Sequence, residues 1–488
     1  MKLENAIKYM NAENASNINP ALLGIEVTSF PTDSREVKAG DLFFAFSQPE
    51  FSENGFNGDF LDATIFVPAA FEQGAAACVV RGDRFRAHRS ELEEFEEKLI
   101  FVDDVIAAYQ RLAAEVYRQW NKPVVAITGS AGKTTAKELT AHVIGSSGRR
   151  ILRNVKNKNN GIGHPATVLE LVDDPEYDLA VLEMGMSTPK NEIERLCRIT
   201  PPEVAIELNV LPVHVEHLGS IEAVRDAKAE LVEGLKPGGT AVLNADDERV
   251  LGMRELHDGR VITYGLENPA DVSAENVEMK RFGETRFRLV MPEGSADVSM
   301  RLSGKHNVLN ALAAAAAASC FEMSPGEIAS ALGTIAPPPQ RGEVLNLKGG
   351  VTVINDSYNS NPEALMKMVT TLTEGAPEGT RKVVVAGEML ELGTDEKEIH
   401  RETGRRLAAS GIDALIGVRG LAEEMVEAAR SGGLGNSEFC EDSLAAGKRL
   451  AEIARAGDVI LIKGSRGVRT ERALEKLLEK HDTMEDES

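Results

Sequence analysis

The chain has 488 residues, enough for about three domains of ordinary size, each with an apolar core of its own. Its 77 acidic and 54 basic residues give a net charge of −23, which argues against nucleic acid and anionic membranes as partners and means that an anionic substrate needs a local cationic site. The four cysteines stand far apart without a C-x-x-C pair, and no apolar run is long enough to span a bilayer. We expect a cytoplasmic monomer that does not insert into membranes.

The first 104 residues predict a small α/β domain of short strands and turns. Its most distinctive pieces are Asp33-Ser34-Arg35 and the run from Gly40 to Ala45. A periodic apolar segment then predicts a helix over 105–120, which ends at the breaker Asn121-Lys122-Pro123.

A second domain, expected over 105–335, opens with an apolar strand that runs from Val124 through a glycine turn into a helix. The turn reads Gly129-Ser130-Ala131-Gly132-Lys133-Thr134-Thr135. Glycines let backbone N–H groups curl around an anion, and the helix N-terminus adds its positive end. Lys133 can offset phosphate charge, and Thr134 can offer its hydroxyl to Mg²⁺. Because Ile127 stands where the common P-loop has its first glycine, the turn alone leaves the class of nucleotide-binding protein open.

Strands and helices alternate beyond this loop, which predicts a parallel sheet covered on both faces. After the prolines 337–339, an expected hinge, a second alternation over 336–488 predicts a separate Rossmann-like domain. The fold class is therefore α/β with three domains. The expected strands are 178–183, 203–209, 240–244, 351–354, 382–386, 414–418 and 458–462, and the expected helices are 191–198, 221–235, 307–320, 362–372, 396–409, 421–429 and 469–480.

Two polar residues follow expected strands of the central sheet. Glu183 ends the strand 178–183, at the sheet edge where ligands of open α/β sheets sit, so it can reach a Mg²⁺ held by Thr134. The alternative is a helix-capping or surface glutamate. His214 follows the strand 203–209, and a lone histidine there can equally be a structural hydrogen-bonding group.

Lys228 is expected to point inward from the helix 221–235. It shares a face with the apolar residues at positions 221, 224, 231 and 235. Burial lowers the pKa of an ammonium and leaves a nucleophilic amine, which can react with CO₂ to form a carbamate. Two alternatives are equally open. Lys228 can pair with Glu183 or another acid, or it can extend its ammonium to solvent.

Two further polar segments are ambiguous by themselves. The loop 154–165 contains Asn160 and is a turn when taken alone. Gly304-Lys305-His306-Asn307 opens an alanine-rich helix, where Asn307 can read an adenine edge or act as the N-cap of the helix.

Taken together, these residues resemble the Mur ligase family, in the right order and over essentially the whole chain. The resemblance is carried by the P-loop 128–135, Glu183-Met184-Gly185, His214-Val215-Glu216, Ala227-Lys228-Ala229-Glu230 and the run 304–311. The run 354–362, with 387–393, 463–467 and the N-terminal pieces, is similar to the MurF branch, and the Asp-Asn-Pro-Arg motif of the MurE branch is absent from 336–488. The chain departs from the usual pattern at Asn154, Lys156, Glu388 and Thr470.

The resemblance implies an ATP-dependent amide ligase. In that family branch, ATP phosphorylates the C-terminal carboxylate of a UDP-N-acetylmuramoyl tripeptide, and the amine of D-alanyl-D-alanine attacks the acyl phosphate. The resemblance implies one Mg²⁺ on Thr134 and Glu183 and a second on His214 and a carbamylated Lys228, with Lys133 also catalytic. It implies that Asn307 contacts adenine, Asp356 the ribose and Arg341 the phosphates, although an arginine after a proline linker is ordinarily only solvated. The implied substrate-binding residues are Asp33, Ser34, Arg35, Asn160, Tyr358 and Ser465.

Two other functions stay open at this point. One is a different amide ligase on the same scaffold, such as a folylpolyglutamate synthase, which would lack the N-terminal domain. The other is a nucleotide-binding scaffold that has lost turnover, although such a protein has little reason to keep Lys133, Glu183, His214 and Lys228. The sequence does not specify diaminopimelate or lysine at the third peptide position, nor whether D-alanyl-D-lactate is accepted.

Overall fold

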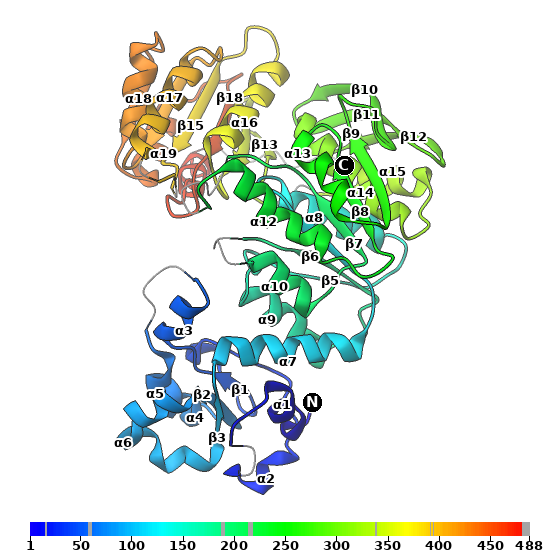
Figure 1. The fold of residues 1–488 in the computed structure, drawn as a ribbon. Helices are drawn as coiled ribbons and strands as arrows, with labels where there is room; N and C mark the ends of the chain where they lie inside the picture. Colours follow the sequence, from blue (N-terminus) through cyan, green and yellow to red (C-terminus); the bar gives the residue numbers. More distant parts are fainter. Residues whose placement is uncertain are drawn as a thin grey trace.

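The computed structural model describes residues 1–14, 17–56, 61–186, 191–212, 218–336, 339–390, 392–393 and 395–480. Over these residues the chain forms three β-sheets, one in each of the three expected domains (Figure 1). The N-terminal sheet lies at the bottom of the view, and the central and C-terminal sheets lie above it. None of the helices among these residues combines the length and the apolar character that a membrane crossing requires.

The N-terminal sheet has three parallel strands in the order β1-β2-β3. Its strands are short and almost wholly apolar, because both faces are covered by helices. The bounds are α1 Leu3–Met10, α2 Pro20–Leu23, β1 Leu42–Phe44, α3 Gln48–Glu53, α4 Val67–Glu72, β2 Ala77–Arg81, α5 Gly82–Ala87, α6 Arg89–Leu92 and β3 Leu99–Val102.

Helix α7, Val105–Trp120, lies between the N-terminal sheet and the central domain (Figure 1). Asp104 caps it by accepting a hydrogen bond from the Ala107 N–H at 2.8 Å, and Asn121 ends it in the left-handed conformation at φ 46°. The predicted helix 105–120 is therefore confirmed. The buried face of α7 belongs to one apolar cluster with strands β1 and β2, so the first two domains share part of their core.

The central sheet runs in the order β12-β11-β10-β9-β8-β7-β4-β6-β5. One face is covered by α8 and α14, and α10 and α12 pack on the other. The bounds are β4 Val124–Thr128, α8 Lys133–Gly145, β5 Ile151–Arg153, α9 Gly163–Leu169, β6 Leu179–Glu183, α10 Glu192–Ile199, β7 Val204–Glu207, α12 Ile221–Glu233, β8 Thr240–Asn244, α13 Glu248–Leu251, β9 Arg260–Gly265, β10 Val272–Arg281, β11 Glu284–Met291, β12 Gly294–Met300, α14 Lys305–Ser319 and α15 Pro325–Thr334.

Strands β10, β11 and β12 depart from the expected all-parallel sheet, because they pair antiparallel with one another. They form a ribbon with tight turns at Gly283 and Gly294, both of which have positive φ (81° and 138°). The burial of β11 alternates along the strand, since one face meets the core and the other meets solvent. This alternation, with a glycine after each strand, is a hairpin pattern that the sequence analysis missed.

The C-terminal sheet runs β13-β14-β18-β15-β16-β17, with β13 antiparallel at the edge and the other strands parallel. The expected Rossmann-like alternation is present, and β13, β17 and α19 are additions to it. The bounds are β13 Glu343–Leu347, β14 Val351–Asp356, α16 Pro362–Gly375, β15 Lys382–Gly387, α17 Glu396–Ala408, β16 Ala414–Val418, α18 Ala422–Ser431, β17 Ser437–Cys440, α19 Ser443–Ile453, β18 Val459–Lys463 and α20 Glu471–Leu478.

The central and C-terminal domains meet where the β10–β11 turn touches the C-terminal core. Phe282, in this turn, packs against the apolar cluster that contains Leu365 and Leu372 of α16. The contact is close, because a Cβ added at Gly375 would lie 2.8 Å from the Phe282 ring. Of the expected hinge, Pro337 and Pro338 lie outside the described residues.

Candidate active site

The phosphate loop is forced into a tight turn by two glycines. Gly129 has φ 153°, and a Cβ added to it would lie 2.7 Å from the Leu208 side chain. Gly132 has φ 87° and precedes α8, and its added Cβ would lie 2.8 Å from Asn310 Oδ1. No larger residue fits either position. The first turn of α8, which starts at Lys133, thus opens directly into the pocket with backbone N–H groups that have no partner within the helix.

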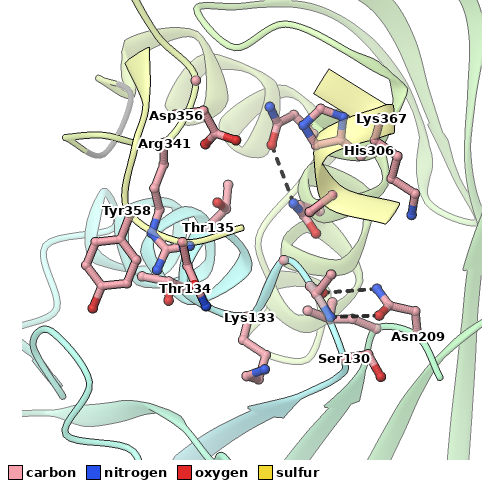
Figure 2. A pocket seen from close by; sticks show the side chains of 18 of the residues that line it. Ser130, Lys133, Thr134, Thr135, Asn209, His306, Arg341, Asp356, Tyr358 and Lys367 are labelled. Carbon is pink, nitrogen blue, oxygen red and sulfur yellow. Dashed lines mark hydrogen bonds between the residues drawn. The ribbon is translucent and has the colours of Figure 1, made fainter. Parts of the chain in front are cut away.

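Asn209 braces this loop from the neighbouring strand. Its Oδ1 accepts a hydrogen bond from the Ala131 N–H at 2.9 Å, and its Nδ2 donates to the Ala131 carbonyl at 3.0 Å (Figure 2). The Asn209 carbonyl also accepts from the Ser130 N–H at 2.9 Å. The sequence analysis did not single out Asn209, although it follows strand β7 in the way that Glu183 ends strand β6.

Lys133 is held at the bottom of the loop. Its Nζ donates to the Gly129 carbonyl at 2.8 Å, which is the only partner that the described residues give it. Burial lowers the pKa of the Lys133 ammonium, and nearby Arg341 lowers it further, while Glu183 acts in the opposite direction. A bound polyphosphate would supply the negative charge that this desolvated ammonium needs.

Glu183 and Thr134 are brought together as predicted. The Thr134 hydroxyl donates to Glu183 Oε2 at 2.8 Å, and Asn159 Nδ2 donates to Glu183 Oε1 at 2.6 Å. Glu183 is only 4% exposed, so the alternative of a surface glutamate is wrong. The second partner, Asn159, was not among the predicted site residues.

Lys228 points into the protein, as its helical position predicts, and is only 2% exposed. Burial lowers its pKa to about 7, helped by the nearby Lys133 charge and opposed by Glu207. An extended, solvated lysine is therefore excluded. The neighbouring acid is Glu207 rather than Glu183, and neither Glu207 oxygen has a hydrogen-bond partner within the described part of the chain. Burial raises the pKa of Glu207 well above its usual range. His214 lies outside the described residues.

The C-terminal domain supplies the opposite wall of the pocket. The Arg341 guanidinium stacks on the Tyr358 ring at 4.1 Å, and both face the P-loop (Figure 2). Asp356 forms an ion pair with the buried Lys463, which also donates to the Asn359 carbonyl at 2.9 Å. His306 lies near Asp356, and its pKa is lowered to about 4 by burial.

Asn307 lies on the same side of the pocket, but it is not the N-cap of its helix. Gly304 occupies the N-cap of α14, and Asn307 comes three residues later. Its Nδ2 donates to the Ser303 carbonyl at 2.8 Å. Asn307 is also one of the residues that line the pocket. The N-cap alternative is therefore wrong.

These groups enclose a pocket of about 350 Å³ between the central and C-terminal domains. Of the predicted site residues, it is lined by Ser130, Ala131, Gly132, Lys133, Thr134, Thr135, Glu183, Asn307, Arg341, Asp356 and Tyr358. Lining residues that were not among the predicted site residues include Asn159, Asn209, His306, Asn310, Lys367 and Lys463. They come from loops and helices whose proximity depends on packing between distant segments.

The remaining predicted substrate residues lie outside this pocket. Asp33 and Arg35 form an exposed ion pair around the turn at Ser34, with Arg35 Nε donating to Asp33 Oδ1 at 2.9 Å. Asn160 Oδ1 accepts from the Gly163 N–H at 2.9 Å, where it shapes the turn into α9. The Ser465 hydroxyl accepts from the Leu390 N–H at 3.0 Å. Their substrate roles stay predictions.

Comparison with known proteins identifies the family. A family model described as "Mur ligase middle domain" matches residues 127–318. A second model, described as "Mur ligase, glutamate ligase domain", matches residues 340–466. A relative from Bacillus subtilis, UDP-N-acetylmuramoyl-tripeptide--D-alanyl-D-alanine ligase, is 33% identical over 94% of this chain and 95% of its own length. This chain belongs to the Mur ligase family. It is an ATP-dependent, ADP-forming ligase.

Solved structures of Mur ligases share the whole architecture. MurF from Acinetobacter baumannii is 26% identical, with a TM-score of 0.83 and coverage of 98% of this chain and 99% of that one. MurF from Thermotoga maritima, in complex with ADP, is 27% identical, with a TM-score of 0.78 and coverage of 93% and 97%. The likeness includes the N-terminal sheet, so the three-domain α/β fold predicted from the sequence is confirmed.

Proposed function

We propose that this Mur ligase joins D-alanyl-D-alanine to the C-terminal carboxylate of a UDP-N-acetylmuramoyl tripeptide, in peptidoglycan precursor synthesis. The name of full-length relatives at 33% and 34% identity supports the choice of substrates. The observation that carries the chemistry is the convergence of Lys133, Thr134 and Glu183 at the mouth of the P-loop, next to a buried Lys228. These groups suit transfer of a phosphoryl group to a carboxylate.

ATP would lie with its phosphates on the N-terminus of α8. Lys133 would leave its hydrogen bond to the Gly129 carbonyl and contact the phosphates, and Arg341 would reach them from the C-terminal wall. Asn307 would contact the adenine and Asp356 the ribose, and both line the same pocket as the phosphate loop. Asp356 is already oriented by Lys463.

The donor set of Thr134 and Glu183 fits Mg²⁺, which binds through a hydroxyl, one or two carboxylates and substrate phosphates. Among the described residues no group of three or more His, Cys, Asp or Glu side chains is arranged to hold a metal by itself, which agrees with a site completed by nucleotide. Mg²⁺ there would neutralise charge on the transferring phosphoryl group. Asn159 and Thr134 hold the carboxylate in place for this role.

A second Mg²⁺ would use His214 and a carbamylated Lys228. A buried amine with a pKa near 7 is partly neutral at physiological pH, and only the neutral amine reacts with CO₂. The neutral nitrogen forms a bond to the CO₂ carbon and releases one proton, which leaves an anionic oxygen ligand; starting from the ammonium, a second proton is released when the amine becomes neutral. The burial of Lys228, and the nearby Lys133 charge that disfavours an ammonium there, support this modification.

The reaction then has two steps. A carboxylate oxygen of the tripeptide attacks the γ-phosphorus of ATP, and ADP leaves. The amine of D-alanyl-D-alanine attacks the carbonyl carbon of the acyl phosphate, loses a proton and expels phosphate. Lys133 offsets the charge that moves during the first step, and Arg341 helps to bind the ATP phosphates. Activation is required because a carboxylate is a poor electrophile.

We propose that the three segments divide this work. Residues 1–104 bind the UDP moiety, with Asp33, Ser34 and Arg35 at the contact, 105–335 bind ATP and 336–488 close over the acceptor. Tyr358, Ser465 and Asn160 would contact the peptide or the dipeptide. The separate sheet in each segment supports the division. A cytoplasmic monomer is consistent with four unpaired thiols.

The test is phosphate release from ATP with product mass as a second readout. Release should require both the UDP-tripeptide and D-alanyl-D-alanine, and the product should gain the mass of the dipeptide less one water. UDP-tripeptides with diaminopimelate and with lysine should be compared, with D-alanyl-D-lactate as a third acceptor. Release that does not depend on both substrates would contradict the proposal.

A further inference from the structure

At Glu183, the end of strand β6 is paired with β4 but has no strand partner on its β5 side. Strand β5 pairs with β6 only as far as Arg153, which lies opposite Val181. On the other side, the Ala180 N–H bonds to the Pro123 carbonyl, just before β4, and the Met184 N–H bonds to the Ile127 carbonyl of β4. Backbone groups alternate in direction along a strand, so the N–H and C=O of Glu183 point to the β5 side, beyond the end of that strand.

The side chain of Asn154 takes the place of the missing strand residue. Its Oδ1 accepts from the Glu183 N–H at 2.9 Å, and its Nδ2 donates to the Glu183 carbonyl at 2.8 Å. The second Nδ2 hydrogen is donated to the Lys158 carbonyl at 2.9 Å. The amide thus continues the β5–β6 ladder by one residue and ties it to the following loop. Asn154 is only 2% exposed, so water does not compete for these bonds.

Lys137 fixes Asn154 from below. The Lys137 ammonium donates to the Asn154 carbonyl and is only 1% exposed. It also pairs with Glu138 at 2.9 Å. Lys137 lies one turn after Thr134 on α8. The helix that offers the Thr134 hydroxyl to the Glu183 carboxylate therefore also supports the residue that holds the Glu183 backbone.

We propose that Asn154 is a positioning residue for Glu183, setting the direction of its carboxylate through the two backbone hydrogen bonds. The inference rests on the proposed Mg²⁺ role of Glu183. The asparagine amide suits this role because it carries two donor hydrogens and one acceptor oxygen. A threonine hydroxyl has a single hydrogen to donate and cannot serve both carbonyls, whereas the asparagine amide serves both and accepts a third bond.

Hydrogen exchange in the ligand-free protein tests the positioning directly. Asn154→Ala should make the Glu183 amide exchange at least about 10-fold faster, in a peptide covering 179–186, because its only acceptor among the described residues is lost. Asn154→Asp should have a smaller effect, since a carboxylate oxygen still accepts from that N–H. The control is Val155→Ala, because the neighbouring Val155 side chain is 48% exposed. Exchange unchanged relative to the control, or raised uniformly across the central sheet, would overturn the proposal.

Calorimetric titration with ADP supplies the functional readout. Asn154→Ala should weaken binding of ADP with Mg²⁺ by about 10-fold and leave binding of ADP without Mg²⁺ unchanged, as expected for a residue that orients a metal ligand. Lys137→Met should act in the same direction more weakly. Equal weakening with and without Mg²⁺ would overturn the proposal. If wild-type affinity does not depend on Mg²⁺, the metal role of Glu183 fails instead, while hydrogen exchange still decides the positioning.

Discussion

The two sides of the nucleotide pocket are built differently. On the P-loop side, Lys133, Thr134 and Glu183 belong to one domain. Asn154 and Asn159 hydrogen-bond to Glu183, and Asn209 hydrogen-bonds to Ala131 of the loop. On the opposite side, Arg341, Tyr358 and Asp356 come from the C-terminal domain (Figure 2). Their geometry relative to the P-loop depends on how the two domains pack, for which the Phe282 turn is one contact.

The P-loop side of the pocket is preorganised, whereas the C-terminal side depends on closure of its domain. The backbone of the P-loop and the Glu183 carboxylate are held in place before any ligand binds, and on this side only short side-chain movements, such as that of Lys133 away from the Gly129 carbonyl, are needed. The C-terminal side can move away as a unit, as hinge-closing enzymes do, and its contribution depends on domain position. Variants of Lys133 and Lys228, on the first side, should therefore change the chemical step, and variants of Arg341, on the second side, should change nucleotide affinity.

The largest effect is expected for Lys133→Met. The variant keeps the length of the side chain but removes the charge that faces the phosphates, so acyl-phosphate formation should fall by about 1,000-fold. The measurement is single-turnover phosphate transfer from ATP to the tripeptide. Lys8→Met, at an exposed position of α1, is the matched control. Transfer at the wild-type rate would show that the P-loop side does not act on the chemistry.

The next effect concerns Lys228. Lys228→Ala should lower ligation by about 100-fold or more, because the proposed carbamate ligand is lost. Short carboxylates such as acetate or propionate should restore part of the activity by occupying the space left by the side chain. Lys133→Ala, assayed in the same carboxylate series, should not be rescued. Wild-type activity in Lys228→Ala would contradict the carbamate.

A smaller effect is expected on stability in acid, through His164 on α9. Burial lowers the pKa of His164 to about 3. The folded state therefore stays neutral while the unfolded state takes up a proton below pH 6.5, and stability is lost as the pH falls. Between pH 6.5 and 5 this costs about 2 kcal/mol of unfolding free energy.

His164→Gln should reduce that acid-induced loss by about the same amount. Urea unfolding followed by the fluorescence of Trp120 measures it, because this is the only tryptophan and it lies on α7, which packs against α9. The free energies at pH 6.5 and at pH 5 are compared within each protein. An identical pH dependence in the variant and the wild type would rule out a buried neutral His164.

The smallest effect is expected on the C-terminal side. Arg341→Ala should raise the KM for ATP by about 10-fold with little change in kcat, because a half-buried arginine contributes one charged contact to the phosphates. Arg472→Ala, at an exposed position of α20, is the control. A decrease in kcat without a change in KM would contradict this prediction, since it would show that Arg341 acts on the chemical step as the P-loop residues do.

Several parts of the site could be predicted because their signals are local. The strand, glycine turn and helix of the P-loop are continuous in sequence, and Lys228 was placed inward by helical periodicity alone. Glu183 followed from the rule that ligands gather at the carboxyl ends of parallel strands. The antiparallel ribbon β10–β12 was not predicted. Its apolar residues alternate with a period of two, and this short pattern lies within a longer alternation of strands and helices that indicates a parallel sheet.

Other parts could not be predicted, because they depend on segments that are distant in the chain. Asn209 and Asn154 act by completing backbone hydrogen bonds of other strands, and nothing in their immediate neighbours marks them for this. The same holds for Glu207, which lies near Lys228 only because β7 packs under α12.

The sequence by itself determined the three α/β units, the phosphate loop and the inward lysine, since these follow from local periodicity and from glycine geometry. Only the tertiary structure decided that Asn307 lines the pocket rather than capping its helix, and that asparagine side chains hydrogen-bond to the P-loop and to Glu183. The physical reason is that hydrogen bonds between distant segments exist only once the sheets have packed and excluded water.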